Sequence, residues 1–247
     1  MGDYLKLFET HAEYQTYEQS GDMLKPNVSY CEDNNEVHYN PIVPPYQGFC
    51  KLMLQDNTIV ELEGSGELTN TMTQDYKTRL VGVETGVLCT SIGVGVFSVF
   101  NELKNVKINN SVTSIDVAAF YGCVSLTNID IPNSVTNIGT QCFDGCTNLT
   151  SVTIGNGVTS IGWSTFNNCT SLTSVTIPNS VTSIEGGAFY NCSSVTIEAT
   201  TPPTLVNDWP FNPNISAIYV PAESVEVYKT ANKWSNFANR IQAIPTT

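Results

Sequence analysis

Residues 134–156 read SVTNIGTQCFDGCTNLTSVTIGN, and residues 157–179 read GVTSIGWSTFNNCTSLTSVTIPN. The two stretches have the same length, and their apolar residues fall at the same places. Extended along the chain, the period of 23 residues builds six columns of Phe, Leu, Ile or Val. The columns are Phe97, Phe120, Phe143, Phe166, Phe189; Ile92, Ile115, Ile138, Ile161, Ile184; Leu103, Leu126, Leu149, Leu172; Val106, Ile129, Val152, Val175; Ile108, Ile131, Ile154, Ile177; and Val112, Val135, Val158, Val181. Such a period with regularly spaced Leu and Ile predicts a leucine-rich-repeat solenoid.

Each repeat contains two stretches that favour β-structure. LTSVTI ends in alternating apolar and polar residues, which predicts a strand, and Val and Thr suit it. SVTSI predicts a second short strand, and GWSTFNNCTS between them predicts an irregular or helical turn that directs its Phe inward. One coil alone buries too little apolar surface to offset the ordering of its backbone, so the coils must stack and share a core. We therefore predict a mainly β solenoid of about five coils over residues 88–199.

The two ends differ from the repeats. Residues 1–87 predict a small α+β module, with a short helix at 10–20 and hairpins at 29–40 and 49–64. Residues 200–247 predict a cap, with a strand at 217–220 and one or two short helices over the open end of the core. The packing residues of this cap would be Val225, Tyr228, Trp234, Phe237 and Ile241. The alternative is a ligand groove lined by Trp209, Tyr228 and Trp234.

The composition disfavours two classes of function. The chain has 10 Lys and Arg against 23 Asp and Glu, a net charge of -13, without a basic cluster. Nucleic-acid binding is therefore not expected, because it requires clustered cations. The apolar runs are shorter than the roughly 20 residues that a membrane helix needs, so membrane insertion is not expected. The first residues lack a basic segment followed by an apolar core, so a secretory signal is not expected either.

Candidate chemical groups are few. Of eight cysteines, Cys123, Cys146, Cys169 and Cys192 share one column, which predicts a ladder of buried, unreactive thiols. Neighbouring thiols of this ladder could also approach disulfide distance. Cys31, His38 and Cys50, with His11, are an alternative zinc set, although their spacing matches no standard finger. No catalytic motif is present, and Asp116, Asp130 and Asp144 fall in non-equivalent columns. We expect no catalytic, cofactor-binding or metal-binding residues, no cofactor, and no enzyme activity.

The outward residues of the LTSVTI strands are the candidate interaction surface. They alternate with the inward columns and form regular rows of short polar side chains that lose little entropy on binding. They are Asn105, Lys107, Asn128, Asp130, Ser151, Thr153, Ser174 and Thr176. The alternative is that they are solvated side chains that serve solubility alone.

The motifs VTSIG, the inward Phe, NC-T and LTSVTIPN resemble the BspA-like leucine-rich repeats of bacterial surface antigens. Separately, KPNVSYCEDNNEVHYNP at residues 25–41 resembles leader segments of structural proteins of phages of gut bacteria. The first resemblance implies the fold. The second implies a virion component whose N-terminal module docks on the particle.

Together these features predict a non-enzymatic structural or interaction protein. The favoured hypothesis is a phage virion component (head fibre, decoration or tail-associated protein), made in the bacterial cytoplasm. Its partners would be other virion proteins or further copies of itself, and we expect a homo-oligomer. The alternative is an adhesin of the bacterial cell surface that binds a host protein or glycan.

Overall fold

The computed structural model describes residues 28–31, 36–39, 47–207 and 209–245. They belong to two compact units, Met1–Pro45 and Tyr46–Thr247. In the first unit, strands β1 (Val28–Cys31) and β2 (Glu36–Tyr39) pair antiparallel, with Cys31 opposite Glu36. This pairing confirms the first predicted hairpin. The helix predicted at 10–20 lies outside the described residues.

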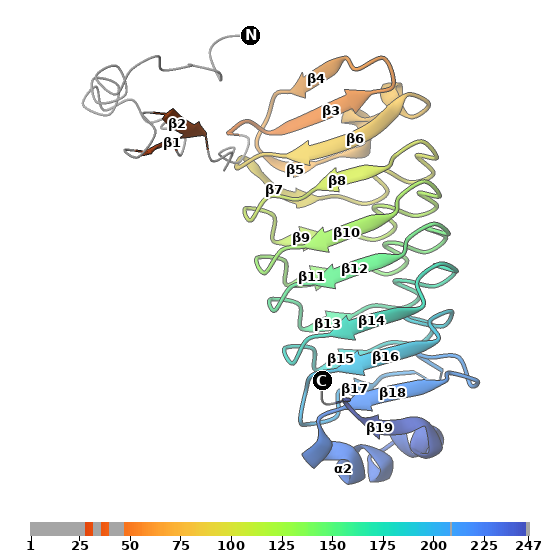
Figure 1. Cartoon of the computed structure of the whole chain (residues 1–247). Coiled ribbons are helices and arrows are strands. Elements are labelled where there is room, and N and C mark those ends of the chain that lie inside the picture. The colour runs from red at the N-terminus through yellow and green to blue at the C-terminus, as the bar shows by residue number, and fades with distance from the viewer. Residues whose placement is uncertain (1–27, 32–35, 40–46, 208, 246–247) are drawn as a thin grey trace. The chain divides into compact units, whose positions relative to one another are not determined.

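The second unit is a stack of coils with strands on two faces (Figure 1). One face is a parallel sheet of seven strands in the order β17-β15-β13-β11-β9-β7-β5. These strands are β5 (Gly66–Leu68), β7 (Cys89–Ile92), β9 (Ser114–Ile115), β11 (Asn137–Ile138), β13 (Ser160–Ile161), β15 (Ser183–Ile184) and β17 (Thr204–Leu205).

The pairing register of this sheet aligns one apolar residue from every strand in a single buried row. The row consists of Leu68, Ile92, Ile115, Ile138, Ile161, Ile184 and Leu205. The predicted isoleucine column is therefore inward throughout, and a leucine extends it at each end.

The second face carries one longer strand per coil. These strands are β6 (Leu80–Thr85), β8 (Asn105–Lys107), β10 (Asn128–Ile131), β12 (Ser151–Ile154), β14 (Ser174–Ile177), β16 (Ser194–Ile197) and β18 (Ala217–Val220). Parallel pairing joins β6 to β8, β10 to β12, β14 to β16 and β16 to β18. The ladder is interrupted between β8 and β10 and between β12 and β14, so this face is less regular than the seven-stranded sheet.

A hairpin closes the N-terminal end of the array. Strands β3 (Cys50–Leu54) and β4 (Ile59–Leu62) pair antiparallel around a turn in which Asn57 has a φ of 64°. This confirms the second predicted hairpin. Strand β3 also pairs antiparallel with β6, and the short 3-10 turns η1 (Asn70–Met72) and η2 (Gln74–Tyr76) follow β5. Residues 47–87 therefore lie in the same compact unit as the repeats, although the predicted division placed residue 87 at a domain boundary.

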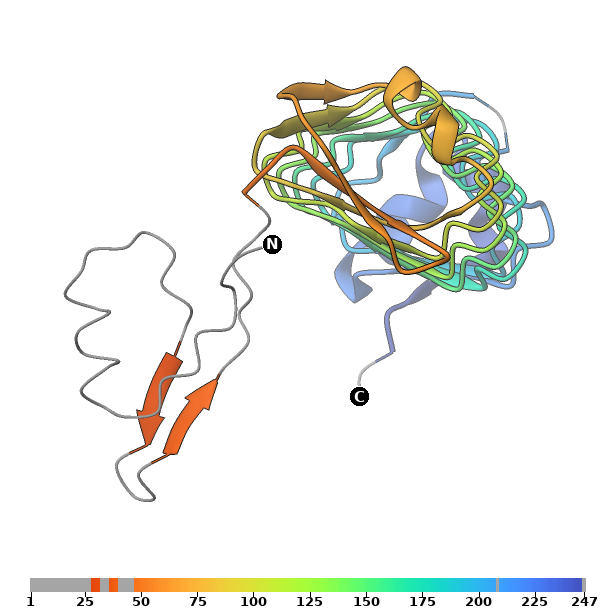
Figure 2. The same cartoon turned by 90° about the horizontal axis from the view of Figure 1, so that it is seen from above.

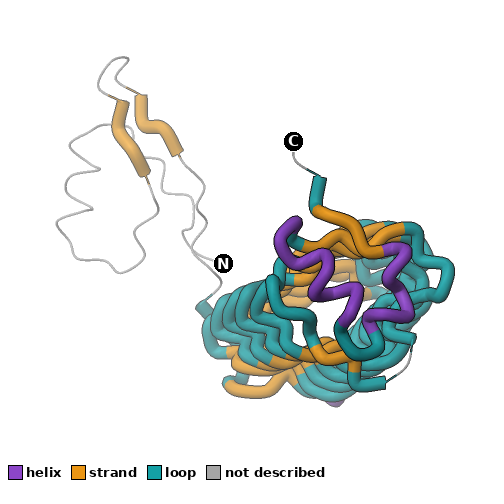
Figure 3. The backbone as a smooth tube through the Cα atoms, turned by 90° about the horizontal axis from the view of Figure 1, so that it is seen from below, coloured by secondary structure: helices purple, strands orange, loops and turns teal. Residues whose placement is uncertain are grey.

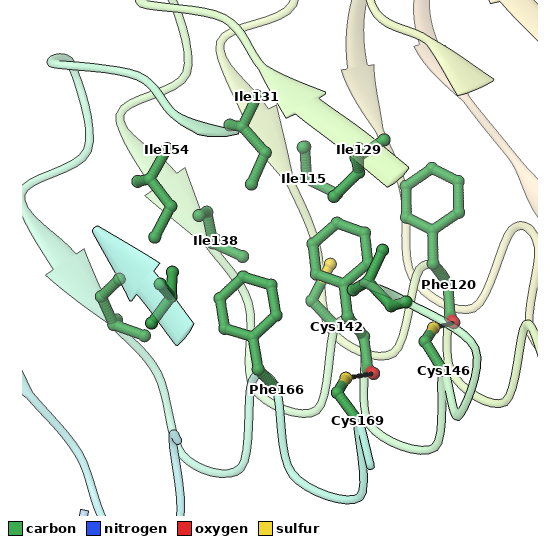
Figure 4. Packing of buried hydrophobic residues seen from close by; sticks show 14 of the residues in the cluster. Ile115, Phe120, Ile129, Ile131, Ile138, Cys142, Cys146, Ile154, Phe166 and Cys169 are labelled. Carbon is green, nitrogen blue, oxygen red and sulfur yellow. Dashed lines mark hydrogen bonds between the residues drawn. The ribbon is translucent and has the colours of Figure 1, made fainter. Parts of the chain in front are cut away.

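The repeat columns point into a shared interior. Seen along the stack, successive coils superpose (Figure 2). The column residues belong to one cluster of buried hydrophobic side chains. Phe97, Phe120, Phe143, Phe166 and Phe189 are all fully buried, and neighbouring rings stack with centroids 5.2–5.4 Å apart. Figure 4 shows Phe120 and Phe166 among the isoleucines of both faces. Val106, Ile108 and Val152 are half-buried and pack against this core.

The turns after β7, β9, β11, β13 and β15 each contain a residue with a left-handed backbone. Gly95, Ala118, Gln141, Ser164 and Gly187, each 23 residues apart, all have φ between 53° and 72°. Glycine adopts this conformation without strain, whereas the other residues are held there by the stack. A second left-handed position in the same turn is filled by Val99, Gly122, Gly145 and Asn168. Val99 is the β-branched member of this set, so its backbone is the most strained.

The array continues beyond residue 199. Strand β17 pairs with β15, Phe211 forms a β-bridge with Phe189 and stacks on its ring at 6.2 Å, and β18 pairs with β16. The strands of the two faces thus run from Gly66 to Val220, a longer stretch than the predicted 88–199. The repeat is hard to recognise there because its spacing shortens to 22 residues between Phe189 and Phe211. The division into attachment module, array and cap stays a prediction as far as its functions are concerned.

Short helices cover the C-terminal end of the core (Figure 3). They are η3 (Ala222–Ser224), α2 (Val225–Thr230) and η4 (Trp234–Arg240), followed by β19 (Ile241–Ala243), which pairs parallel with β18. Trp234 and Phe237 pack against Phe211, with ring centroids 5.7 Å from its ring in both cases. The predicted cap residues Tyr228, Trp234, Phe237 and Ile241 are buried, and Val225 is half-buried.

Candidate functional site

The predicted interaction residues are all exposed on the longer strands. Asn105 and Lys107 lie on β8, Asn128 and Asp130 on β10, and the others on β12 and β14. Within the paired strands, Asn128 lies opposite Ser151, and Asp130 lies opposite Thr153. The inward residues between them, such as Ile129 and Val175, are buried. The structure therefore brings the eight side chains onto one face, in rows set by the coils.

This face carries little free charge. Lys107 donates to the carboxylate of Glu84 on β6, with 2.7 Å between Nζ and Oε1. Both groups are partly exposed, so the pair adds little to stability, but it neutralises the one cation among the eight residues. Asp130 is the remaining charged residue of the set, and the other six are neutral. The face offers mainly hydroxyl and amide groups as donors and acceptors.

The structure also shows a second exposed surface, which the sequence analysis did not predict. Large apolar side chains are exposed on the turns that carry the buried phenylalanines: Val94, Val99, Val117, Tyr121, Trp163, Tyr190 and Trp209. Trp163 is 47% exposed and Trp209 is 51% exposed. The sequence signal was present, because Val94, Val117 and Trp163 fall in one column at multiples of 23 residues. Exposed Trp and Tyr are the residues that most often anchor protein interfaces.

The cysteine ladder lies in the core. Cys123, Cys146, Cys169 and Cys192 are buried, as are Cys50, Cys89 and Cys142, and all seven are free thiols. The Sγ of Cys146 donates to the carbonyl of Phe120 at 3.2 Å, and Cys169 donates to Phe143 at 3.1 Å (Figure 4). Burial raises the pKa of Cys146 to about 12. A thiol that is buried and stays protonated is a poor nucleophile, so these groups serve packing.

One acidic side chain among the described residues is buried. Asp144 is 6% exposed and accepts hydrogen bonds from three side-chain amides. Gln141 Nε2 lies 3.3 Å from Oδ2, while Asn167 Nδ2 and Asn168 Nδ2 lie 3.4 and 3.1 Å from Oδ1. Because Asn167 and Asn168 belong to the next coil, this cluster joins two coils. Its carboxylate oxygens are occupied, which suits a structural role.

The structure bears on two alternative sites that the sequence analysis left open, an aromatic groove and a zinc site. Tyr228 and Trp234 are buried, so they do not line the alternative groove with the exposed Trp209; their burial agrees with the predicted cap. Of the alternative zinc set, Cys50 is buried in the core, while His11 and the side chains of Cys31 and His38 lie outside the described residues. Among the residues that the structure describes, no three His, Cys, Asp or Glu side chains form a potential metal site. No helix in this part of the chain has the length and apolar character to span a membrane.

Solved structures with a similar arrangement are bacterial leucine-rich repeat proteins. A leucine-rich repeat protein from Eubacterium ventriosum is 19% identical, with a TM-score of 0.48 over 70% of this chain and 49% of that one. The leucine-rich repeat protein of T. pallidum is 22% identical, with a TM-score of 0.42 over 66% of this chain and 73% of that one. This chain spans about half the length of the Eubacterium protein.

A comparison with functionally curated proteins gives no match. The model of the BspA-type leucine-rich repeat region matches residues 76–224 in six copies, which is more than half of the chain. The VTSIG, inward Phe and LTSVTI motifs lie within this range, and their columns form the stacked core described above. The chain belongs to the BspA-type leucine-rich repeat family.

Proposed function

We propose that the chain is a non-enzymatic interaction protein that binds a macromolecular partner through the exposed face of β8, β10, β12 and β14. The observation that carries the proposal is the exposure of all eight predicted side chains on strands whose inward residues are locked in a shared core. Short side chains on strands that pack against this core lose little entropy when a partner binds.

The favoured setting remains the virion, as the resemblance of residues 25–41 to phage leader segments implies. In this setting the first compact unit docks on the particle or on further copies of the chain, and the array faces outward. The alternative setting is the bacterial cell surface, where the array would bind a host protein or glycan. Membership of a family named for a bacterial surface antigen favours this second setting.

Immunogold labelling of a producing culture separates the two settings. Antibodies against Tyr46–Thr247 should label particles if the chain is a virion component, and intact cell envelopes if it is an adhesin. Label confined to the cell interior, in cultures that release particles, would contradict both.

The binding face is tested by charge insertion. The double variant Asn128→Arg, Ser151→Arg places two bulky cations on adjacent strands of the proposed face. It should reduce attachment of the purified chain to the labelled particle or cell at least tenfold. The control, Thr136→Arg with Thr159→Arg, changes two exposed residues beside the other sheet and should attach normally. Equal attachment of both variants and the natural chain would refute the proposed face.

A further inference from the structure

One corner of the array departs from the repeat and forms a groove. Residues Ile177 and Ile184 are seven positions apart, whereas the equivalent Ile197 and Leu205 are eight apart and enclose Pro202 and Pro203. The longer connection leaves a groove of about 550 Å³ against the preceding coil. This volume lies within the range of about 300–1,000 Å³ that is typical of small-molecule sites.

At three regular corners the adjacent coils are bonded or packed closely together. Ser111 Oγ donates to the carbonyl of Cys89, and Ser134 Oγ donates to the carbonyl of Val112, each at 2.7 Å across adjacent coils. At Gly157 the preceding coil is so close that a Cβ atom would collide with the carbonyl of Asn133. This serine bond to the preceding coil is absent at Ser180, whose buried Oγ has no hydrogen-bond partner among the described residues. Ser180 lies in sequence between Asn179 and Val181, which both line the groove.

The wall of the groove is held rigidly from behind. Tyr228 Oη donates to the carbonyl of Ala199 at 2.8 Å, and Trp234 Nε1 donates to the carbonyl of Pro203 at 2.7 Å. Both aromatic side chains are buried in the cap. At its two ends the connection is also bonded to the preceding coil, from Glu198 N to the carbonyl of Ile177 and from Thr204 N to that of Thr182. A preformed groove of this kind costs little ordering on binding.

The lining is neutral and mixes hydroxyl groups with aliphatic carbon. Its polar side chains are the amide of Asn179 and the hydroxyls of Thr182, Thr200, Thr201 and Thr204. Its apolar part comes from Val181, Ala199, Pro202 and Pro203. Hydroxyls and amides both donate and accept hydrogen bonds, so they match a ligand that itself carries many hydroxyls. The described lining residues include no cation, and the chain has a net charge of -13; both features disfavour an anionic ligand.

A second groove adjoins the first at the same corner. It measures about 360 Å³ and is lined by residues that include Thr153, Thr176, Pro178 and Glu198. Pro178 and Glu198 line this groove, and the next residues along the chain, Asn179 and Ala199, line the first. A linear ligand can therefore extend from the corner onto the proposed interaction face, where the Glu198 carboxylate can accept hydrogen bonds from two neighbouring hydroxyls.

We propose that the corner groove binds a neutral oligosaccharide, and this proposal rests on the proposed function as an interaction protein. The threonine hydroxyls and Asn179 bind the hydroxyls of the sugar, and the proline and valine carbons contact its C–H faces. A peptide fits less well, because the lining of the corner groove offers its side chains no aromatic pocket among the described residues, and Glu198 in the adjoining groove is the one charged partner.

The test is titration calorimetry on the full chain with three uncharged probes, maltotetraose, cellotetraose and chitotetraose. An uncharged Ser/Thr/Pro heptapeptide is the fourth probe. Asn179→Ala removes one lining amide and should weaken binding of the responding sugar at least fivefold. Asn110→Ala is the matched control, because Asn110 holds the same repeat position three coils away and is exposed; its affinity should stay within twofold. Thr201→Arg, which fills the groove, should abolish binding while the circular dichroism spectrum stays unchanged.

Lack of heat with all three sugars at 10 mM or more would overturn the proposal. Sugar binding that survives Thr201→Arg would overturn it as well, and so would binding of the peptide alone. The variant Asn128→Arg, Ser151→Arg separates this proposal from the proposed function, because neither residue lines either of the two grooves described above. If that variant loses attachment but still binds the sugar, both proposals stand. If Thr201→Arg alone loses attachment, the groove and not the strand face is the binding surface.

Discussion

Replacing Phe143 by alanine removes the central ring of the phenylalanine stack. The ring is fully buried, and it stacks on Phe120 and Phe166 with centroid distances of 5.3 Å on both sides. A buried Phe→Ala change costs about 3–5 kcal/mol through lost burial and the cavity that remains. Because two aromatic contacts of about 0.5–1.5 kcal/mol each are lost as well, we expect the upper end, about 4–5 kcal/mol.

The assay is urea unfolding followed by far-ultraviolet circular dichroism and by tryptophan fluorescence. Two probes are needed because a repeat array can unfold in more than one step. Tyr121→Ala is the control, since Tyr121 follows the buried Phe120 and is exposed; this change should cost less than about 1 kcal/mol. A loss below about 1.5 kcal/mol for Phe143→Ala, or a loss equal to that of the control, would refute a close-packed aromatic column.

Three further predictions follow from the fold. Val99→Gly should raise the free energy of unfolding by about 1 kcal/mol in a thermal unfolding assay, because it relieves a φ of 61° at an exposed valine. Val117→Gly changes a valine of similar exposure and should lower the free energy of unfolding in the same assay. Burial raises the pKa of Cys146 from 9.0 to about 12, so the thiol loses its proton at lower pH in the unfolded chain than in the folded one. Thermal stability should therefore fall as the pH rises above 9. Cys146→Ala should reduce the slope of the unfolding free energy against pH by about 1.4 kcal/mol per pH unit. A chain that begins at Tyr46 should keep the melting temperature of the array. A chain that begins at residue 88 should aggregate or melt at a lower temperature, because it loses β5 and β6, which pair with β7 and β8. Equal melting temperatures of the two chains in a calorimetric scan would contradict this.

The regular part of the fold could be predicted from sequence because one physical constraint recurs in every coil. The columns that contain Phe143 and Ile138 must face inward each time, and the period reports this directly. The sequence analysis missed the end coils because other residues occupy the inward columns there. Leu205 and Phe211 occupy the Ile and Phe columns, but their spacing is irregular.

The surface was harder to predict than the core. The outward direction of Asn128 and Ser151 follows from strand alternation, so their exposure could be predicted. The burial of Asp144 could not, since it depends on amides that the next coil supplies. The corner groove depends on one added residue and on two hydrogen bonds from the cap, to the carbonyls of Ala199 and Pro203. Contacts between non-equivalent parts of the chain leave no periodic signal.

The most direct test of the stacked core is thiol labelling of the native chain, with each modified cysteine located by mass spectrometry. Cys123, Cys146, Cys169 and Cys192 should stay unlabelled by iodoacetamide at pH 8 for hours and become labelled once the chain is unfolded in guanidinium chloride, because they lie in the core. Labelling of these four in the native chain as fast as in the unfolded one would contradict the stacked array.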